Sequence, residues 1–283
     1  MKEKILFLHT PKTGGGSMEW MFWNQTKHLD TFFFSFNGID YSHFNKNEFS
    51  TNHPRANKCL IETIHYNPSI VERYNNSPHF NSCKLLLGHT TSSLPTLFPK
   101  YNFKCMMVIR EPIERTISNI CQFSQESIKG NFIKFGAHKT SAKKYSEEYW
   151  DFIYEIITKE KPIRGLLKHE NCFLRNCMSR MICGSKYNNI DEDLSLDKVI
   201  EMSKNIYISL YNDFNNGIQK HFDLFDIPID MSKNTFAKQG KPNQNNQKKK
   251  NGKHYGAPEK IIEFVKKTNM LDIEFYKYFT ENE

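Results

Sequence analysis

The sequence predicts an α/β fold in which helices flank a central parallel sheet, and two similar segments carry this prediction. Residues 5–8 and 103–109 are short apolar runs, each followed by polar residues and then by a helical pattern. Apolar runs without alternation are typical of strands covered on both faces, as in a parallel sheet. At 283 residues the chain is long enough to bury a large core, so we expect one domain over residues 1–283.

The first apolar run leads into a glycine-rich loop with three consecutive glycines. Consecutive glycines allow successive backbone N–H groups to point toward an anion. A helix predicted over residues 17–28 would add its N-terminal N–H groups and its dipole to the same site. The expected phosphate-binding residues are Lys12, Thr13, Gly14, Gly15, Gly16 and Ser17. The alternative is an ordinary strand-to-helix turn with a surface lysine.

The second apolar run ends in a basic residue, Arg110, and Pro112 is well placed to begin the helix that follows. In a triphosphatase the end of such a strand carries an aspartate for magnesium, so Arg110 indicates an anion here, and we predict no metal site. The loop also differs from G-x-x-x-x-G-K-[ST], because Lys12 precedes its glycines instead of following them. Ser118 lies eight residues after Arg110, about two helical turns.

The remaining patterns predict the other elements. Residues 32–36 form a strand or an apolar turn. Further strands are expected over residues 59–64, 84–88 and 206–210, and helices over residues 145–159, 170–181, 196–204 and 214–225. The helix over residues 145–159 has an apolar face at helical spacing, and Pro162 prevents it from continuing.

Residues 9–17, with the glycine-rich loop, and residues 108–118, with Arg110, are called the two anchor segments below. They resemble the motifs of one enzyme family. His9-Thr-Pro-Lys-Thr-Gly-Gly-Gly-Ser17 closely resembles the 5′-phosphosulfate loop of sulfotransferases that use 3′-phosphoadenosine 5′-phosphosulfate (PAPS). Val108-Ile-Arg-Glu-Pro-Ile-Glu-Arg-Thr-Ile-Ser118 is similar to their 3′-phosphate motif, in which an arginine and a serine bind the 3′-phosphate. The nearest branch is that of the carbohydrate O-sulfotransferases related to the heparan sulfate enzymes. Gly16, where threonine or serine is common, and Glu111, where aspartate is usual, depart from the family pattern.

The resemblance implies a P-loop-like central sheet, PAPS as cofactor, and 3′-phosphate binding by Arg110 and Ser118. It also implies that Lys12 stabilises the leaving oxygen. Leu87-Gly-His89 resembles the branch's G-H pattern, whose histidine is a candidate base. His89 follows an apolar run, and strand carboxyl ends are where open α/β sheets bind ligands, so we expect it near Lys12. Glu62 is the alternative base, although a lone strand carboxylate more often faces solvent.

The resemblance continues in the second half of the chain. Residues 176–184 are similar to a helical segment on the acceptor side of the family, and residues 258–279 to its closing helices. Residues 239–256 are a basic, low-complexity stretch with the composition of a flexible linker. Because the family places the matching stretch near the cofactor's phosphates, we expect these residues to order over bound nucleotide.

Composition limits the other possibilities. The formal net charge of +8 favours anionic partners, but a chain rich in lysine and asparagine acquires such a charge without any function. No apolar run approaches 18 residues, and the first predicted strand begins within a few residues of Met1. We therefore expect no transmembrane segment and no signal peptide, a cytoplasmic location and reduced cysteines.

The function expected is transfer of a sulfuryl group from PAPS to an acceptor hydroxyl. The resemblance favours a carbohydrate acceptor, and a small natural product is the alternative. Two other classes remain open. A P-loop kinase-like enzyme is disfavoured by the position of Lys12 and by the missing magnesium aspartate. A non-catalytic anion-binding or nucleic-acid-binding protein is compatible with the basic stretch, although we expect no nucleic-acid partner.

Overall fold

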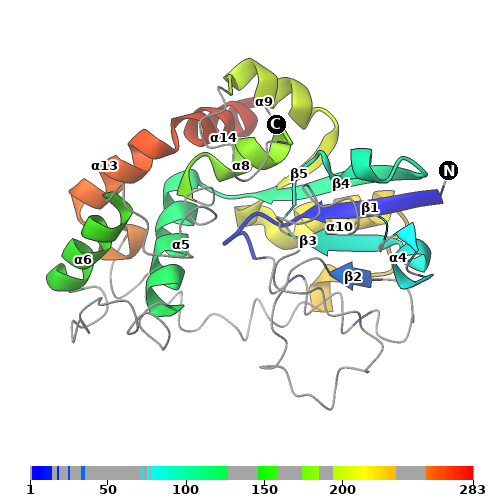
Figure 1. Cartoon of the computed structure of the whole chain (residues 1–283), viewed down its shortest axis with the longest axis horizontal. Coiled ribbons are helices and arrows are strands. Elements are labelled where there is room, and N and C mark those ends of the chain that lie inside the picture. Colours follow the sequence, from blue (N-terminus) through cyan, green and yellow to red (C-terminus); the bar gives the residue numbers. More distant parts are fainter. Residues whose placement is uncertain are drawn as a thin grey trace, which may run out of the picture.

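The computed structural model describes residues 2–14, 18, 25, 33–35, 72, 75–76, 78–88, 90–126, 146–158, 174–184, 194–233 and 253–282. Within these ranges the central feature is a five-stranded sheet with the order β2-β3-β1-β4-β5, and all of its pairings are parallel. The strands are β1 (Lys2–Leu8), β2 (Phe33–Ser35), β3 (Leu85–Gly88), β4 (Tyr101–Ile109) and β5 (Ile206–Leu210). The central strand β1 lies between β3 and β4 (Figure 1).

Helices of the described ranges surround this sheet. The α-helices are α4 (Pro78–Ser82), α5 (Pro112–Glu126), α6 (Glu147–Thr158), α8 (Cys177–Ile182), α9 (Leu196–Ser203), α10 (Phe214–Leu224), α13 (Glu259–Thr268) and α14 (Met270–Asn282). Short 3-10 turns are η2 (Leu94–Leu97), η5 (Tyr211–Asp213), η6 (Met231–Lys233) and η7 (Lys253–Gly256). None of the described helices combines the length and apolarity needed to cross a bilayer.

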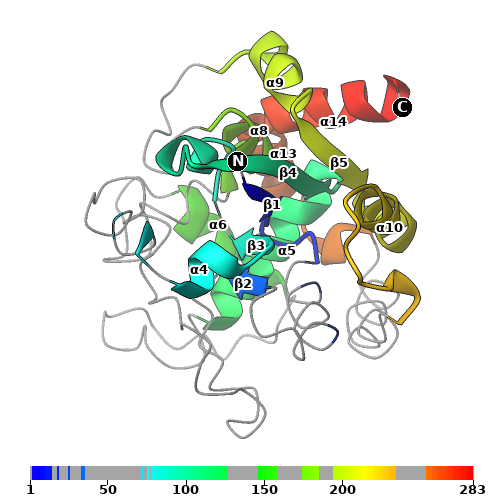
Figure 2. The same ribbon diagram turned by 90° about the vertical axis from the view of Figure 1, so that its right-hand side faces the viewer.

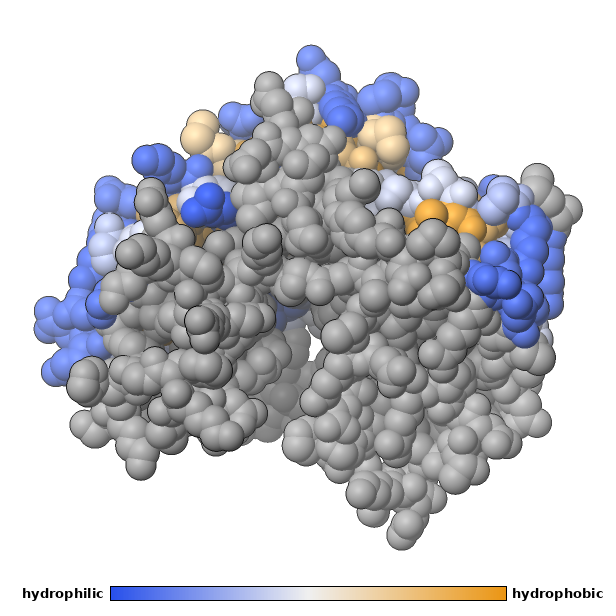
Figure 3. All heavy atoms as spheres, viewed as in Figure 1, coloured by the Kyte–Doolittle hydropathy of each residue, from blue (hydrophilic) through white to orange (hydrophobic). Residues whose placement is uncertain are grey.

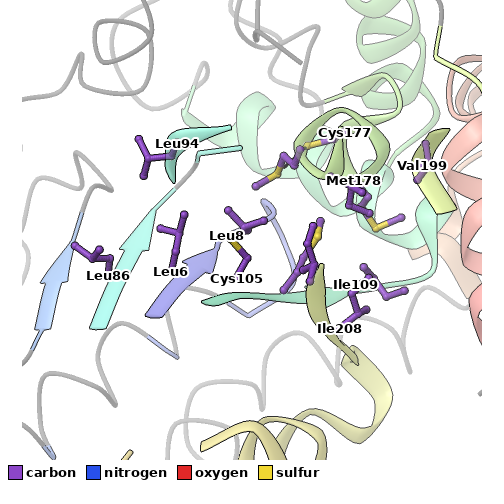
Figure 4. Close-up of a cluster of buried hydrophobic side chains, with 14 of the residues drawn as sticks. Leu6, Leu8, Leu86, Leu94, Cys105, Ile109, Cys177, Met178, Val199 and Ile208 are labelled. Carbon is purple, nitrogen blue, oxygen red and sulfur yellow. Dashed lines mark hydrogen bonds between the residues drawn. The ribbon is translucent and has the colours of Figure 1, made fainter. Parts of the chain in front are cut away.

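The two faces of the sheet bury two separate cores. Leu6 and Leu8 of β1 join a cluster with α8, α9 and α14, whereas Ile5 and Phe7 face the opposite way and pack with α10. This division follows from the strand period of two, which sends successive side chains to opposite faces. Both faces are covered, as expected for the unbroken apolar run. Figure 2 shows α9 and α14 together on one side, and Figure 4 shows the strand side chains meeting those of α8 and α9.

A third core lies beyond the sheet, where α5 packs with α6, α13 and η7 (Figure 1). Its outer surface over α6 and α13 is largely hydrophilic (Figure 3) and carries the exposed ion pair between Lys260 and Asp151. Together the three cores build a single α/β unit from the described elements.

A buried polar network joins α5, α8 and α14. Asp272 is fully buried and accepts hydrogen bonds from the backbone N–H of Met178 (3.1 Å) and of Ser179 (2.8 Å). These donors belong to the first turn of α8, where N–H groups lack partners within the helix. The Ser179 hydroxyl donates to the same carboxylate at 2.7 Å, and Arg115 of α5 lies 4.0 Å from it. Asp272 therefore caps one helix and faces a buried cation.

A second buried cation, Lys4 of β1, joins the sheet to the C-terminal end of α4. Its Nζ donates to the carbonyl oxygens of Phe80 (2.7 Å) and Cys83 (2.5 Å), and it lies 4.4 Å from the centroid of the Tyr101 ring. Burial lowers the pKa of Lys4 below its ordinary value. The amine supplies donors to carbonyl groups at the C-terminal end of α4, which have no partners within that helix.

Most elements expected from the sequence are present. The predicted strands near residues 5–8, 32–36, 84–88, 103–109 and 206–210, and the helices near residues 145–159, 196–204 and 214–225, are confirmed. The helix predicted over residues 170–181 is wrong in its continuity. Leu174 is helical, but Arg175 and Asn176 form a bend in which Asn176 has a left-handed backbone (φ 46°), and α8 begins at Cys177. Residues 170–173 lie outside the described residues. Of the helix over residues 17–28, Met18 and Gln25 are described and both are helical. The strand over residues 59–64 lies outside the described residues.

Candidate anion-binding site

The order of the strands creates a topological switch point at the carboxyl ends of β1 and β4. From β1 the chain continues to β2 on one side, and from β4 it continues to β5 on the other, although β1 and β4 are neighbours. Such a reversal of direction is a topological switch point, and open α/β sheets bind ligands there, beyond the carboxyl ends of the strands. The two segments that leave β1 and β4 at this point are the two anchor segments of the sequence.

The loop after β1 is tightly held by backbone hydrogen bonds. The N–H of His9 donates to the carbonyl of Gly88 at 2.8 Å, so the loop starts beside the end of β3. The hydroxyl of Thr13 donates to the Thr10 carbonyl at 2.7 Å and closes a turn. Lys12 and Gly14 have positive φ angles of 71° and 90°. The N–H of Met18 donates to the Gly14 carbonyl at 3.0 Å, an i→i−4 bond that marks the start of a helix.

Position 14 requires glycine for two reasons, its backbone conformation and the lack of room for a side chain. Its φ of 90° is rarely adopted by residues with a side chain. A Cβ at this position would lie 3.1 Å from Cε2 of Phe214 and 3.4 Å from Cε2 of Tyr211. The aromatic residues that follow β5 therefore pack directly on the loop that follows β1.

Arg110, at the end of β4, is 5% exposed and is held on several sides. Its Nη1 donates to the Lys12 carbonyl at 3.0 Å, its Nη2 pairs with Oε2 of Glu114 at 3.2 Å, and its Cζ lies 4.8 Å from the centroid of the Tyr211 ring. Burial lowers the pKa of Arg110, but Tyr255, Tyr211 and Glu114 outweigh burial, and the pKa is raised overall. The guanidinium group therefore stays charged.

The helix that follows Arg110 is capped by Glu111. Oε1 of Glu111 accepts from the N–H of Ile113 at 3.1 Å, and Oε2 accepts from the N–H of Glu114 at 2.7 Å. The carboxylate thus satisfies first-turn donors of α5 and lies at the positive end of its dipole. Glu111 therefore stabilises the start of α5 directly after Arg110.

Ser118 is buried on α5 and meets a residue from the far end of the chain. The hydroxyl of Tyr255 donates to Oγ of Ser118 at 3.5 Å, and Tyr255 also interacts with Arg110. His254, Tyr255 and Gly256 all have left-handed backbone angles (φ 54°, 60° and 71°). Left-handed residues with side chains are costly, by about 1–2 kcal/mol each. This cost and the burial of Tyr255 show that the end of the basic stretch is held against α5.

The structure thus brings together several of the predicted site residues. Lys12, Thr13 and Gly14 share one loop, and Arg110 is bonded to that loop through the Lys12 carbonyl. The predicted residues Gly15, Gly16, Ser17, His89 and Glu62 lie outside the described residues. Of the predicted flexible stretch 239–256, only residues 253–256 are described.

Sequence reasoning missed two residues of this site, Tyr211 and Tyr255. Both lie about a hundred residues or more from the segments that they contact, and no spacing rule connects them. A weak signal existed for Tyr255, the aromatic residue that follows a lysine-rich stretch without apolar periodicity. For Tyr211 the signal was its place directly after an apolar strand, where parallel sheets gather their ligand-binding groups.

The side chains gathered here are of types that suit an anion. The donors are a buried arginine, hydroxyl groups and a lysine on a loop with a left-handed backbone. Within the described residues, no group of three histidine, cysteine, aspartate or glutamate side chains is arranged to hold a metal ion. Neither a protein-family model nor a curated protein sequence matches the chain significantly.

Proposed function

We propose that the protein is a sulfotransferase that moves the sulfuryl group of PAPS to an acceptor hydroxyl, on a P-loop-like sheet. One observation carries the proposal. At the switch point of a parallel sheet, the arginine that ends β4 is bonded to the backbone of the lysine in the glycine-rich loop, with Nη1 of Arg110 3.0 Å from the Lys12 carbonyl oxygen. The two segments that resemble the family's phosphate motifs are therefore adjacent, as a shared nucleotide site would require.

Two buried polar atoms without hydrogen-bond partners favour the proposal of a ligand that is rich in hydrogen-bond acceptors. Nε of Arg110 and Oγ1 of Thr10 are both buried without a hydrogen-bond partner among the described residues. A buried polar group that lacks a partner costs about 1–3 kcal/mol, and such groups in native proteins commonly indicate a functional role or a bound ligand. Phosphate and sulfate oxygens are acceptors that bind arginine well. The residues present therefore fit an anionic nucleotide.

The residues that would hold the nucleotide divide into two sets. Arg110 and Ser118, linked through Tyr255, are suited to the 3′-phosphate. The N–H groups of the glycine-rich loop, from Thr13 to Ser17, are suited to the 5′-phosphosulfate. Arg110 is the residue that would select a 3′-phosphorylated nucleotide over ATP, because its charge lies at the end of β4 and its position is set by the bond to the Lys12 carbonyl.

In the proposed reaction, Lys12 would stabilise negative charge on the leaving oxygen and His89 would accept the proton of the acceptor hydroxyl. Lys12 would place its ammonium group beside the leaving oxygen, and fixed charges of this kind commonly supply a large share of catalysis. His89, as a neutral imidazole, would accept the proton of the acceptor hydroxyl, a step typically worth about 10²–10⁴-fold in rate. The sulfonate carries less charge than a terminal phosphate, so fixed donors suffice to stabilise it. The expected acceptor is a carbohydrate, with a small natural product as the alternative.

The proposal is tested by calorimetric titration with 3′-phosphoadenosine 5′-phosphate, AMP and ATP, with and without magnesium. We expect binding of the 3′-phosphorylated nucleotide to exceed that of AMP at least about tenfold, the equivalent of about 1.4 kcal/mol. Arg110→Gln should abolish this preference. Lys220→Gln removes the same charge from an exposed position on α10 and should preserve it. Equal losses for both nucleotides in Arg110→Gln, or tighter binding of ATP with magnesium, would refute the proposal.

The catalytic roles need a separate assay. Labelled PAPS and a panel of carbohydrate and small-molecule hydroxyl acceptors would identify the substrate class. His89→Ala should then lower turnover while the affinity for 3′-phosphoadenosine 5′-phosphate stays unchanged. If nucleotide binding is lost instead, His89 is not the base.

A further inference from the structure

Tyr211 contacts both anchor segments, although it belongs to neither. It is the first residue after β5 and begins η5. The centroid of its ring lies 4.8 Å from Cζ of Arg110, and its Cε2 lies 3.4 Å from the point where a Cβ on Gly14 would be. The same ring therefore touches the strand end that carries the arginine and the loop that carries the lysine.

The other contacts of Arg110 show how the Tyr211 ring contributes to holding the guanidinium group in place. The Lys12 carbonyl and the Glu114 carboxylate hold two nitrogens of the guanidinium group. Hydrogen bonds to a planar group restrain it mainly within its plane. Tyr255 also bonds to the guanidinium group. The ring of Tyr211, at cation–π distance, adds a contact that these hydrogen bonds do not supply, and arginine stacks well on aromatic rings. Because Arg110 is buried, the interaction with Tyr211 is little weakened by water.

We propose that Tyr211 is a positioning residue that holds the Arg110 guanidinium group ready for a phosphate. The identity of that phosphate, the 3′-phosphate of the nucleotide, rests on the proposed function. The positioning itself does not, because it depends only on the contacts of Tyr211 with Arg110 and with the loop at Gly14. An arginine already fixed in its binding orientation loses less side-chain freedom when the anion arrives, and its affinity for the anion is higher as a result.

Two substitutions separate the ring from its hydroxyl group. Tyr211→Leu removes the aromatic face, and we expect the affinity for 3′-phosphoadenosine 5′-phosphate to fall about 5–30-fold, the range of a partly to fully desolvated cation–π contact. The affinity for AMP, which lacks the 3′-phosphate, should change less than about twofold. Tyr211→Phe keeps the face and should restore the affinity to near the original value. Tyr211→Met, also without a ring, replaces the leucine variant if that one does not fold.

A matched control is available on β5, the strand that precedes Tyr211. Tyr207 is also a partly buried tyrosine packed on the α10 core, and its ring meets Phe225 and His221, with centroids 4.7 Å and 5.6 Å apart. Tyr207→Leu thus removes a comparable ring from β5 at a distance from Arg110. Nucleotide affinity should be unchanged in this variant.

The positioning role has a readout that needs no ligand. The Nε–Hε resonance of Arg110, assigned by its absence in Arg110→Gln, should shift in Tyr211→Leu and stay in place in Tyr211→Phe and Tyr207→Leu. An unchanged resonance in Tyr211→Leu, or a phenylalanine variant as weak as the leucine variant, would overturn the inference. If the resonance shifts as expected but the unaltered protein binds no 3′-phosphorylated nucleotide, then the positioning is supported and the proposed function is refuted.

Discussion

Replacing Asp272 tests whether the buried polar network holds α5, α8 and α14 together. The carboxylate accepts three hydrogen bonds from the first turn of α8 at 2.7–3.1 Å, and Arg115 lies 4.0 Å away with no exposed surface of its own. Each buried donor that loses its acceptor costs about 1–3 kcal/mol, and a buried cation that loses its counter-ion costs about 3–5 kcal/mol. Asp272→Ala therefore removes an amount comparable with the whole stability of a domain, about 5–15 kcal/mol, and should yield no folded protein.

Asp272→Asn is the informative variant, because it keeps the shape of the side chain. The amide oxygen can still accept from Ser179, whereas the amide nitrogen would face the N–H of Met178 or the guanidinium group of Arg115. We expect a loss of about 3 kcal/mol, since one donor is orphaned and the negative charge is gone. For a chain of 283 residues the midpoint of thermal unfolding should fall by roughly 5 °C, measured by circular dichroism.

Glu274→Gln provides the control for this experiment. It makes the same chemical change two residues away, on an exposed position of α14, where substitutions typically alter stability by less than about 0.5 kcal/mol. If Asp272→Asn shifts the midpoint no more than Glu274→Gln does, the carboxylate is not a structural anchor and the reasoning fails.

Three further outcomes are expected. Gly14→Ala should destabilise the protein by at least about 1 kcal/mol, because of its positive φ and the Phe214 ring 3.1 Å from the new Cβ; an unchanged urea midpoint would contradict this. Burial raises the pKa of Cys105 from 9.0 to about 12, so the stability that its protonated thiol contributes is complete below pH 9 and is lost as the pH rises from 9 toward 12. Between pH 8 and pH 10 the free energy of unfolding should therefore fall about 1.4 kcal/mol more than in Cys105→Ala, and parallel pH profiles would refute the assignment. Lys4→Met should cost about 1–3 kcal/mol, because the Cys83 carbonyl loses the Lys4 donor and the Phe80 carbonyl keeps only the weak thiol donor of Cys83, as urea titration would show.

Where the sequence prediction of a helix was wrong, a distant residue was responsible. The pattern over residues 170–181 is helical, but Asn269 of the segment between α13 and α14 accepts from the N–H of Asn176 at 3.1 Å and donates to the Leu174 carbonyl at 2.7 Å. These bonds replace the helical partners of both groups and hold Asn176 in its left-handed conformation. Local periodicity contains no information about such a partner, because Asn269 lies 93 residues away.

The sequence alone determined the strands, the start of α5 and the loop after β1, because these depend on neighbours in the chain. Unbroken apolar runs favour strands that are buried on both faces, Pro112 suits the first turn of a helix, and Gly14 permits a positive φ. The same local patterns indicated Lys12 and Arg110 as anion-binding residues. What they could not indicate was the hydrogen bond between these two residues.

Only the tertiary structure decided that contact and the positions of Tyr211 and Tyr255. The order β2-β3-β1-β4-β5 makes β1 and β4 neighbours, and it places the residue after β5 over the guanidinium group of Arg110. The packing of η7 on α5 brings the Tyr255 hydroxyl to Ser118. These contacts depend on which strand faces which and on how helices fill the space around the sheet. Both are properties of the whole packed chain, because burial is shared among segments that lie far apart in sequence.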